Sequence, residues 1–263
     1  MAARLRTLRL VVAYDGADFA GWQRQAGQRT VQGELEAVLA RIEGAPVHVA
    51  GAGRTDAGVH AAAQVASITL TAVLTPERLV RACNATLPVD VRVVSVEEMP
   101  ERFHARIHAR GKTYRYFIWH APVGQPLMRR TAWHVPQRLS LAAMQEAAAL
   151  FVGEHDFSAF QAQGSDVKTT VRRIWASTIE PAAVLPPWCA SADDRGRLLV
   201  FDVAGSGFLR HQVRTMAGTL VLVGKGRLSH AEVRRALAGG SRAATGPTAP
   251  ACGLHLWRVH YPE

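Results

Sequence analysis

The sequence predicts an α+β protein built from two ferredoxin-like (RRM-like) βαββαβ units with mainly antiparallel sheets. Segments in which apolar and polar residues alternate predict strands, and segments with apolar residues three and four apart predict helices. The resulting order of elements is βαββαβ, and it occurs twice along the chain. With 263 residues, 48% hydrophobic and 20% charged, the chain can bury a substantial core. We place the units at residues 1–105 and 106–263, with the boundary near residues 100–109.

The first unit is expected to hold four strands and two helices. Its first helix covers residues 31–43, where apolar side chains recur at helical spacing. Its second helix begins at Thr75 and Pro76, a favourable N-cap and first-turn pair. The strands are expected near residues 5–14, 46–50, 64–71 and 89–97.

The second unit is expected to repeat this order with unrelated residues, so the repeat is one of topology and not of sequence. An alanine-rich helix begins at Ser140, and one or two helices lie between Phe208 and Leu237. The segment 181–196 is rich in Pro, Ala and Asp, which predicts an exposed hairpin extension. The strands are expected near residues 112–120, 171–179, 197–203 and 254–260.

Hydropathy and cysteine usage exclude several classes of protein. No apolar run approaches the ~20 residues that span a membrane. The segment 5–14 is interrupted by Arg9 and followed by Asp15, which fits a first strand better than a secretory signal. The cysteines are Cys83, Cys189 and Cys252. Their odd number and wide spacing argue against a disulfide framework or a zinc site and favour a reducing cytoplasm.

The positive charge lies almost entirely in the second half. Residues 1–105 hold 11 basic and 11 acidic side chains, whereas residues 106–263 hold 20 basic and 10 acidic ones and carry the net charge of +10. Two stretches lack acidic residues altogether, and their basic residues are Arg102, Arg106, Arg110, Lys112, Arg115, Arg129, Arg130 and Arg138, then Arg210, Arg214, Lys225 and Arg227. Such runs can be plain solvated surface, but clustered Arg and Lys favour a polyanion partner.

Residues 51–61 read G-A-G-R-T-D-A-G-V-H-A and have almost no bulk with which to build a core. Glycines allow unusual backbone conformations and the close approach of a partner. We therefore expect Arg54, Thr55, Asp56 and His60 to be displayed on a loop between the second and third strands. A tight turn that merely carries charge is the alternative, and a phosphate loop is excluded because no Gly-Lys-Ser/Thr follows.

Other catalytic patterns are absent from the sequence. Ser206 lies between two glycines without the spacing of a nucleophile elbow. The 11 histidines form no metalloprotease motif, and no dinucleotide fingerprint is present. The strand near 112–120 carries basic residues between aromatic ones, a pattern of RNA-binding surfaces. Because Tyr114 and Tyr116 share one face and Arg115 the other, packing of both rings in the core is the alternative.

Motifs along nearly the whole chain resemble the TruA family of tRNA pseudouridine synthases. They are Y-D-G at 14–16, G-W-Q-R-Q at 21–25, V-Q at 31–32, the loop 51–61, F-H-A-R at 103–106, K-T-Y-R-Y at 112–116, G-E-H-D-F-S-A-F at 153–160, F-L-R-H-Q-V-R at 208–214 and G-L at 253–254. Two features depart from the family pattern. Gln212 stands where a methionine is common, and the segment 181–196 is longer than in compact members.

The resemblance implies a pseudouridine synthase fold and a cytoplasmic homodimeric isomerase that needs no cofactor. Its substrate would be uridine at positions 38, 39 and 40 of the tRNA anticodon stem-loop. Asp56 would be the covalent catalyst, Tyr114 would stack on the uracil and Arg214 would pair with Asp56, while Arg54 would fill the space left by the flipped base. Further residues expected to bind the substrate are Thr55, His60, Arg24, Arg110, Lys112 and Leu254.

Two other functions remain open from the residues alone. One is a non-catalytic RNA-binding protein with two RRM-like units, although the RNP1 pattern is missing. The other is an RNA-directed hydrolase that uses Asp56 and His60. Whether Asp56 attacks uracil C6 or ribose C1′ is also left open by the sequence.

Overall fold

The computed structural model describes residues 5–162, 167–184 and 196–262 and divides into two compact units. The first unit contains the described residues up to Arg110 and those from His255 onward, and the second runs from Gly111 to Leu254. This division differs from the expected one, because the last strand was assigned to the second unit. His255 and Leu256 instead pair in parallel with His60 and Ala61, residues of the first unit.

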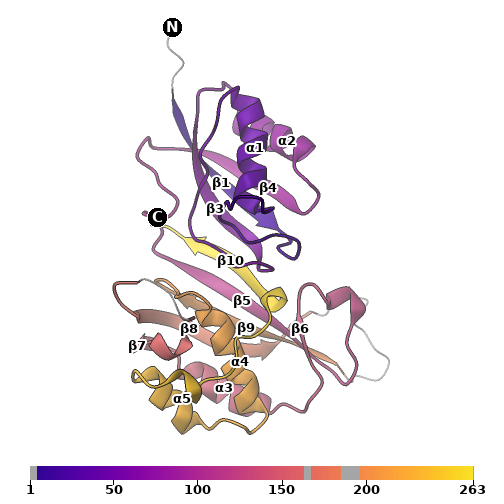
Figure 1. Cartoon of the computed structure of the whole chain (residues 1–263), viewed down its shortest axis with the longest axis vertical. Helices are drawn as coiled ribbons and strands as arrows, with labels where there is room; N and C mark the ends of the chain where they lie inside the picture. Colours follow the sequence, from indigo (N-terminus) through magenta and orange to yellow (C-terminus); the bar gives the residue numbers. More distant parts are fainter. Residues whose placement is uncertain (1–4, 163–166, 185–195, 263) are drawn as a thin grey trace. The chain divides into compact units, whose positions relative to one another are not determined.

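The first unit contains the strands β1, β2, β3 and β4, most of β10, and the helices α1 and α2 (Figure 1). In its sheet β4, β1 and β3 are antiparallel neighbours. The outer edge of β3 is shared between β2, which is antiparallel to it, and β10, which is parallel to it. The bounds are β1 Arg6–Tyr14, α1 Val31–Glu43, β2 Ala50–Gly51, β3 His60–Leu70, α2 Pro76–Thr86, β4 Val91–Met99 and β10 Leu254–His260.

Helix α1 covers the residues that the sequence predicts, and its ends have a clear physical cause. The Thr30 side chain accepts a hydrogen bond from the backbone of Gly33, and Gly44 closes the helix with φ of 77°. Thr75 caps α2 in the same way by accepting from the backbone of Arg78.

The strand expected near 46–50 is wrong, since only Ala50 and Gly51 are strand. Val47 and Val49 are buried, as the hydropathy pattern requires, but the backbone of Val49 bonds to two side chains of α1. Gln32 donates to the Val49 carbonyl and Glu36 accepts from its N–H. These bonds replace the ladder to a neighbouring strand.

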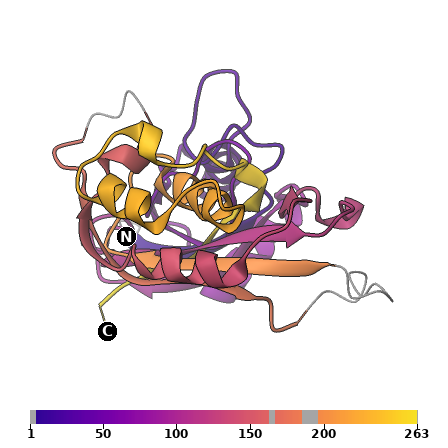
Figure 2. The ribbon, with the colours of Figure 1, turned by 90° about the horizontal axis from the view of Figure 1, so that it is seen from below.

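The second unit has the antiparallel sheet order β5-β9-β8-β7, with β6 parallel to β5. Helices α4 and α5 lie on one face of this sheet (Figure 2), and α3 packs against α4 and β8. The bounds are β5 Gly111–His120, β6 Trp133–Val135, α3 Leu141–Ala149, β7 Gly153–Asp156, β8 Val171–Pro181, β9 Arg197–Gly205, α4 Gln212–Gly224 and α5 His230–Leu237.

Both units bury aromatic and aliphatic side chains under their sheets. In the second unit, Phe157 and Phe160 from the G-E-H-D-F-S-A-F block are completely buried, and the Phe160 ring meets that of Phe151 edge to face at 5.6 Å. Burial of such a ring stabilises the fold by about 1.5–3 kcal/mol. Phe157 and Phe160 of this block are therefore core residues.

The predicted hairpin extension is defined only at its base. Strands β8 and β9 are antiparallel, and Ala182 N–H donates to Leu198 O at 2.7 Å. The remainder of the extension, residues 185–195, lies outside the described residues. In the part of the chain that the structure describes, no helix has the length and hydrophobicity to cross a membrane.

Candidate functional site

The loop between β2 and β3 is tied to its surroundings by its backbone. Its Gly53 carbonyl accepts from Gln64 Nε2 (2.8 Å), its Thr55 carbonyl accepts from Trp22 N–H (3.1 Å), and its Gly58 N–H donates to Phe19 O (3.3 Å). A turn closes it where Val59 N–H donates to Asp56 O at 3.2 Å. The loop is held on both sides of Asp56, as a rigid scaffold holds functional loops.

Two glycines of the N-terminal motifs allow this loop to lie against the segment 14–22. Gly21 has φ of 101°, and a Cβ there would lie 2.6 Å from the Thr55 carbonyl oxygen. A Cβ on Gly16 would lie 1.9 Å from the Val59 carbonyl oxygen. Side chains are thus excluded at both positions by backbone contact.

Thr55 is buried and not displayed, so that part of the expectation is wrong. Its hydroxyl lies 2.8 Å from the Tyr14 hydroxyl. Burial raises the pKa of Tyr14 well above its ordinary value, so the phenol stays protonated. Gln64, which also bonds to Tyr14, is completely buried behind the loop. Tyr14, Thr55 and Gln64 form a polar anchor under the loop.

His60 is also buried, contrary to the expected display on the loop. It is the first residue of β3, and its Nδ1 accepts from the Gly16 N–H at 3.0 Å. The same nitrogen lies 3.1 Å from Asp15 Oδ1, and the ring stacks on that of His255 at 4.6 Å. His60 therefore links the base of the loop to the Y-D-G motif and to β10.

Arg54 and Asp56 flank the buried Thr55. Arg54 is exposed, and its Nε donates to Gln23 Oε1 at 3.1 Å. Asp56 is half-buried. A guanidinium and a carboxylate of the same loop thus reach the surface of the first unit.

The other expected residues of the first unit occupy the surface. Arg24 forms an ion pair with Glu36 at 3.2 Å, although its own side chain is 70% exposed. Arg110 is exposed, and its backbone N–H donates to His260 O at 2.8 Å.

In the second unit, Tyr114 and Tyr116 lie on one face of β5, as the alternation predicts. Tyr116 is completely buried and its hydroxyl donates to Pro250 O at 2.8 Å, so the core alternative holds for this ring. Tyr114 is 8% exposed and meets Phe208 edge to face at 5.1 Å. Arg115, on the other face, donates to Asp202 at 2.7 Å across the strands.

Arg214 is positioned by helix α4 and by the segment 245–250. Its Nε donates to Ala249 O at 2.7 Å, and its own carbonyl accepts from Ala249 N–H at 3.1 Å. This approach needs Gly218, since a Cβ there would lie 1.9 Å from the Pro247 carbonyl oxygen. Ala249 thus bonds to both the backbone and the side chain of Arg214, which fixes the helix against the segment 245–250 and orients the arginine side chain.

The remaining residues of the second unit named from the sequence are Gln212, Lys112 and Leu254, and all three are at least partly buried. Gln212 is completely buried, and its Oε1 accepts from the Leu209 N–H at 2.8 Å, which secures the start of α4 at the position where a methionine is common. Lys112 is half-buried on β5, and Leu254 is 6% exposed.

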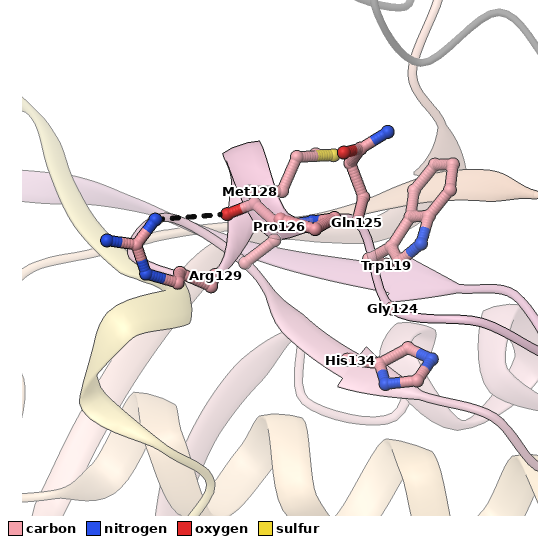
Figure 3. Close-up of a pocket in the computed structure, with 8 residues that line it drawn as sticks. Trp119, Gly124, Gln125, Pro126, Met128, Arg129 and His134 are labelled. Carbon is pink, nitrogen blue, oxygen red and sulfur yellow. Dashed lines mark hydrogen bonds between the residues drawn. The ribbon is translucent and has the colours of Figure 1, made fainter.

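A pocket of about 290 Å³ in the second unit is lined by Arg129 of the acid-free stretch but by none of the residues that the family resemblance assigns to the active site (Figure 3). Its polar side chains bond to backbone carbonyls nearby, as Trp119 Nε1 does to Val123 and His134 Nε2 to Ala121. The pocket is lined by Trp119 and by residues of the segment 124–134. Among the described residues, no group of three or more His, Cys, Asp or Glu side chains could hold a metal ion.

Sequence reasoning gave no site role to the residues that hold the loop. Tyr14, Gln23 and Gln32 were noted only as parts of the family motifs, and Gln64 only as the start of an expected strand. A signal was present for Gln64, which is a long polar side chain in a strand whose residues are mostly apolar.

The chain is similar over its length to known proteins of one family. Residues 10–107 and 147–262 match the family described as tRNA pseudouridine synthase. The chain is 45% identical to tRNA pseudouridine synthase A of Pelobacter propionicus, over 98% of this chain and 100% of that one. It is 46% identical to the enzyme of the same name from Solidesulfovibrio magneticus, over 97% and 90%, and 40% identical to that of Ruminiclostridium cellulolyticum, over 98% and 100%.

Among solved structures, the archaeal box H/ACA sRNP Nop10–Cbf5 complex is similar over 82% of this chain and 43% of that chain. The TM-score of 0.33 and the identity of 16% make this likeness too weak to add to the assignment. The sequence matches, together with the anchored G-R-T-D loop, place this chain in the tRNA pseudouridine synthase A (TruA) family.

Proposed function

We propose that this chain converts uridine to pseudouridine at positions 38, 39 and 40 of the tRNA anticodon stem-loop. Membership of the tRNA pseudouridine synthase A family supports the reaction. The observation that carries the proposal is the loop around Asp56, in which backbone bonds at Gly53, Thr55 and Gly58 hold the carboxylate on a turn.

The reaction is an isomerisation and needs no oxidant or reductant. The C1′–N1 bond of the nucleoside breaks, a C1′–C5 bond forms, C5 loses its hydrogen and N1 gains one. Asp56 forms a covalent intermediate, which splits the exchange into two easier steps. Attack of the carboxylate on uracil C6 and attack on ribose C1′ both satisfy this balance.

Tyr114 and Arg214 supply the other catalytic groups. The Tyr114 ring stacks on the uracil, and its edge-to-face contact with Phe208 supports this role because it fixes the plane of the ring. By the family resemblance, Arg214 is the residue that we propose to pair with the Asp56 carboxylate through a charge-assisted contact. The bond from its Nε to Ala249 O supports this assignment by orienting the side chain in advance.

The target base must leave the stack, which costs a few kcal/mol. Arg54 fills the vacated space, and its exposure at the surface of the first unit suits this role. Phosphates of the stem contact basic surface side chains, with Arg24, Arg110 and Lys112 as the first candidates. Thr55 and His60 are buried, so we assign them the support of the Asp56 loop, and Leu254 is kept as a further candidate for substrate binding.

The fold is a pseudouridine synthase fold in which each of the two units has a ferredoxin-like topology. The strand order β4-β1-β3-β2 of the first unit supports this topology. In the second unit, the antiparallel order β5-β9-β8 with α3 before β8 and α4 after β9 supports it.

The active form is a cytoplasmic homodimer in which one tRNA contacts both chains. A curved anticodon arm is larger than one 28.5 kDa chain with a neutral N-terminal half can cradle. Light scattering of an active preparation at micromolar concentration measures the mass. A monomer mass in such a preparation contradicts the dimer.

Release of tritium from tRNA labelled at uridine C5 tests the function. We expect release that depends on the enzyme and stops in Asp56→Asn, with the RNA chain left uncut. Binding without release would identify an RNA-binding protein, and chain cleavage would identify a hydrolase.

A further inference from the structure

A chain of side-chain hydrogen bonds runs from the interior of the first unit to Arg54. Gln32 Nε2 donates to Glu36 Oε1 at 3.1 Å, both on helix α1. Gln23 Nε2 donates to Gln32 Oε1 at 2.8 Å, and Arg54 Nε donates to Gln23 Oε1 at 3.1 Å. Three consecutive bonds thus link a buried carboxylate to an exposed guanidinium.

The chemistry of the two ends fixes the direction of every bond in this chain. A guanidinium can only donate and a carboxylate accepts. Arg54 therefore needs the oxygen of Gln23, which leaves the Gln23 nitrogen to face Gln32. Gln32 in turn must present its oxygen to Gln23 and its nitrogen to Glu36. Neither amide can reverse without placing two donors or two acceptors together.

The inner end of the chain is buried and bonded to the backbone of Arg24 and Val49. Gln32 is 4% exposed, and its amide also donates to Val49 O at 3.1 Å and accepts from Arg24 N–H at 2.8 Å. Glu36 is 8% exposed and accepts from the Val49 N–H at 3.2 Å. Because a buried polar group that loses its partner is costly, these two side chains have one arrangement.

The outer end is two residues from Asp56, where a long exposed side chain would otherwise sample many rotamers. A guanidinium held in place before RNA arrives does not have to be ordered at that moment, so binding loses less conformational entropy. We propose that Glu36, Gln32 and Gln23 are positioning residues that orient Arg54 toward the RNA. This inference rests on the proposed function, in which Arg54 takes the place of the flipped base.

The same bonds could instead serve only to attach α1 to the segment 21–25. The two possibilities differ in whether loss of the chain acts through Arg54. Gln23 is the residue to change, because Gln32 keeps its Arg24, Val49 and Glu36 partners when Gln23 is lost. Methionine matches its length and removes the amide.

The first test is a double-mutant cycle on single-turnover rates with saturating enzyme. Gln23→Met is expected to slow pseudouridine formation about tenfold, as for loss of a hydrogen bond to a charged group. Added to Arg54→Ala, the same change is expected to have less than about a twofold effect. Gln25→Met is the matched control, since exposed Gln25 donates to Ala20 O outside the chain. Equal losses in both backgrounds, or no loss in either, overturn the proposal.

A second measurement does not depend on catalysis. The exchange of the Arg54 Nε–H with water, followed by ¹H–¹⁵N NMR at mildly acidic pH, is expected to quicken in Gln23→Met and to stay unchanged in Gln25→Met. Unchanged exchange in Gln23→Met overturns the proposal whatever the activity. A protein that makes no pseudouridine but whose Arg54 exchange responds overturns the proposed function and supports the positioning chain.

Discussion

The Asp56 loop of the first unit and the Arg214 region of the second fix their functional side chains by different means. Asp56 lies on irregular backbone, and polar bonds from buried Gln64 and from the segment 14–22 hold that backbone in place. Arg214 and Tyr114 lie on a helix and a strand, where regular hydrogen bonding already fixes the backbone. Their side chains are set by packing on Phe208 and by the bonds to Ala249.

This difference predicts which kind of substitution disturbs the geometry of each region. A loop held by polar anchors loses its geometry when one buried partner is removed, because the other partner is left unsatisfied. Helix α4 is held by the segment 245–250, so the Arg214 region should lose its geometry when the close approach of these two backbones at Gly218 is blocked. Four experiments sharpen this comparison.

The largest expected effect is that of Asp56→Asn. The amide keeps the size of the carboxylate and removes the nucleophile, so the single-turnover rate should fall by roughly a thousandfold or more. Binding to tRNA should stay within a few-fold, because the bonds that hold the loop at Gly53, Thr55 and Gly58 are made by its backbone. A variant that kept roughly a tenth of the rate would exclude the covalent role and move the assignment elsewhere in the loop.

The next effect compares two glycines with the same close approach, Gly16 and Gly218, each of which would bring a Cβ within 1.9 Å of a carbonyl oxygen. Gly16→Ala should lower the free energy of unfolding by about 3 kcal/mol through overpacking. Gly218→Ala should cost about 2 kcal/mol, since alanine recovers some helix propensity. Chemical denaturation measures both values.

Gly207→Ala is the control for these two variants, because its Cβ would meet only the Arg172 side chain at 3.8 Å. It should change the stability by less than about 0.5 kcal/mol. If all three substitutions were equally mild, the close approaches would not define either region.

Much of this fold could be predicted from the sequence, since caps and hydrophobic periodicity are local signals. Thr30, Thr75 and Ser140 all cap the helices expected after them. The absence of a strand at residues 46–49 could not be predicted, because the backbone of Val49 bonds to the side chains of Gln32 and Glu36 on α1, 17 and 13 residues earlier in the chain.

In the candidate site, too, the features that depend on local sequence could be predicted, and those that depend on residues far apart in sequence could not. Arg54 and Asp56 were predicted to be displayed because a glycine-rich loop with charges is a local pattern, whereas their proposed roles came from the family resemblance. The burial of Thr55 and His60 was missed because it depends on Tyr14 and Gly16, which lie some 40 residues away in sequence. Tertiary partners of this kind leave no local periodicity.

A smaller effect is expected from Tyr14→Phe, which removes the hydrogen bond to the Thr55 hydroxyl. Near neutral pH the variant should be about 1 kcal/mol less stable. Burial raises the pKa of Tyr14 above its unfolded value, so the stability this group contributes is complete below about pH 10 and is lost as the pH rises further. Wild-type stability should therefore fall more steeply than that of the variant in alkaline solution, by about 1.4 kcal/mol per pH unit. Parallel pH profiles would show that the phenol ionises equally in both states.

The smallest effect compares two arginines of the acid-free stretch, Arg110 and Arg115. Arg110 is exposed, whereas Arg115 donates to Asp202 at 2.7 Å. Arg110→Gln should weaken tRNA binding several-fold and reduce the log–log salt slope by about 0.7 to 0.9, as for one lost phosphate contact. The double variant Arg115→Gln, Asp202→Asn removes a neutral pair, so its affinity should stay within about twofold and its slope unchanged. A slope reduced as much as in Arg110→Gln would mean that Arg115 leaves Asp202 for a phosphate when RNA binds, and that the ion pair belongs to the free protein alone.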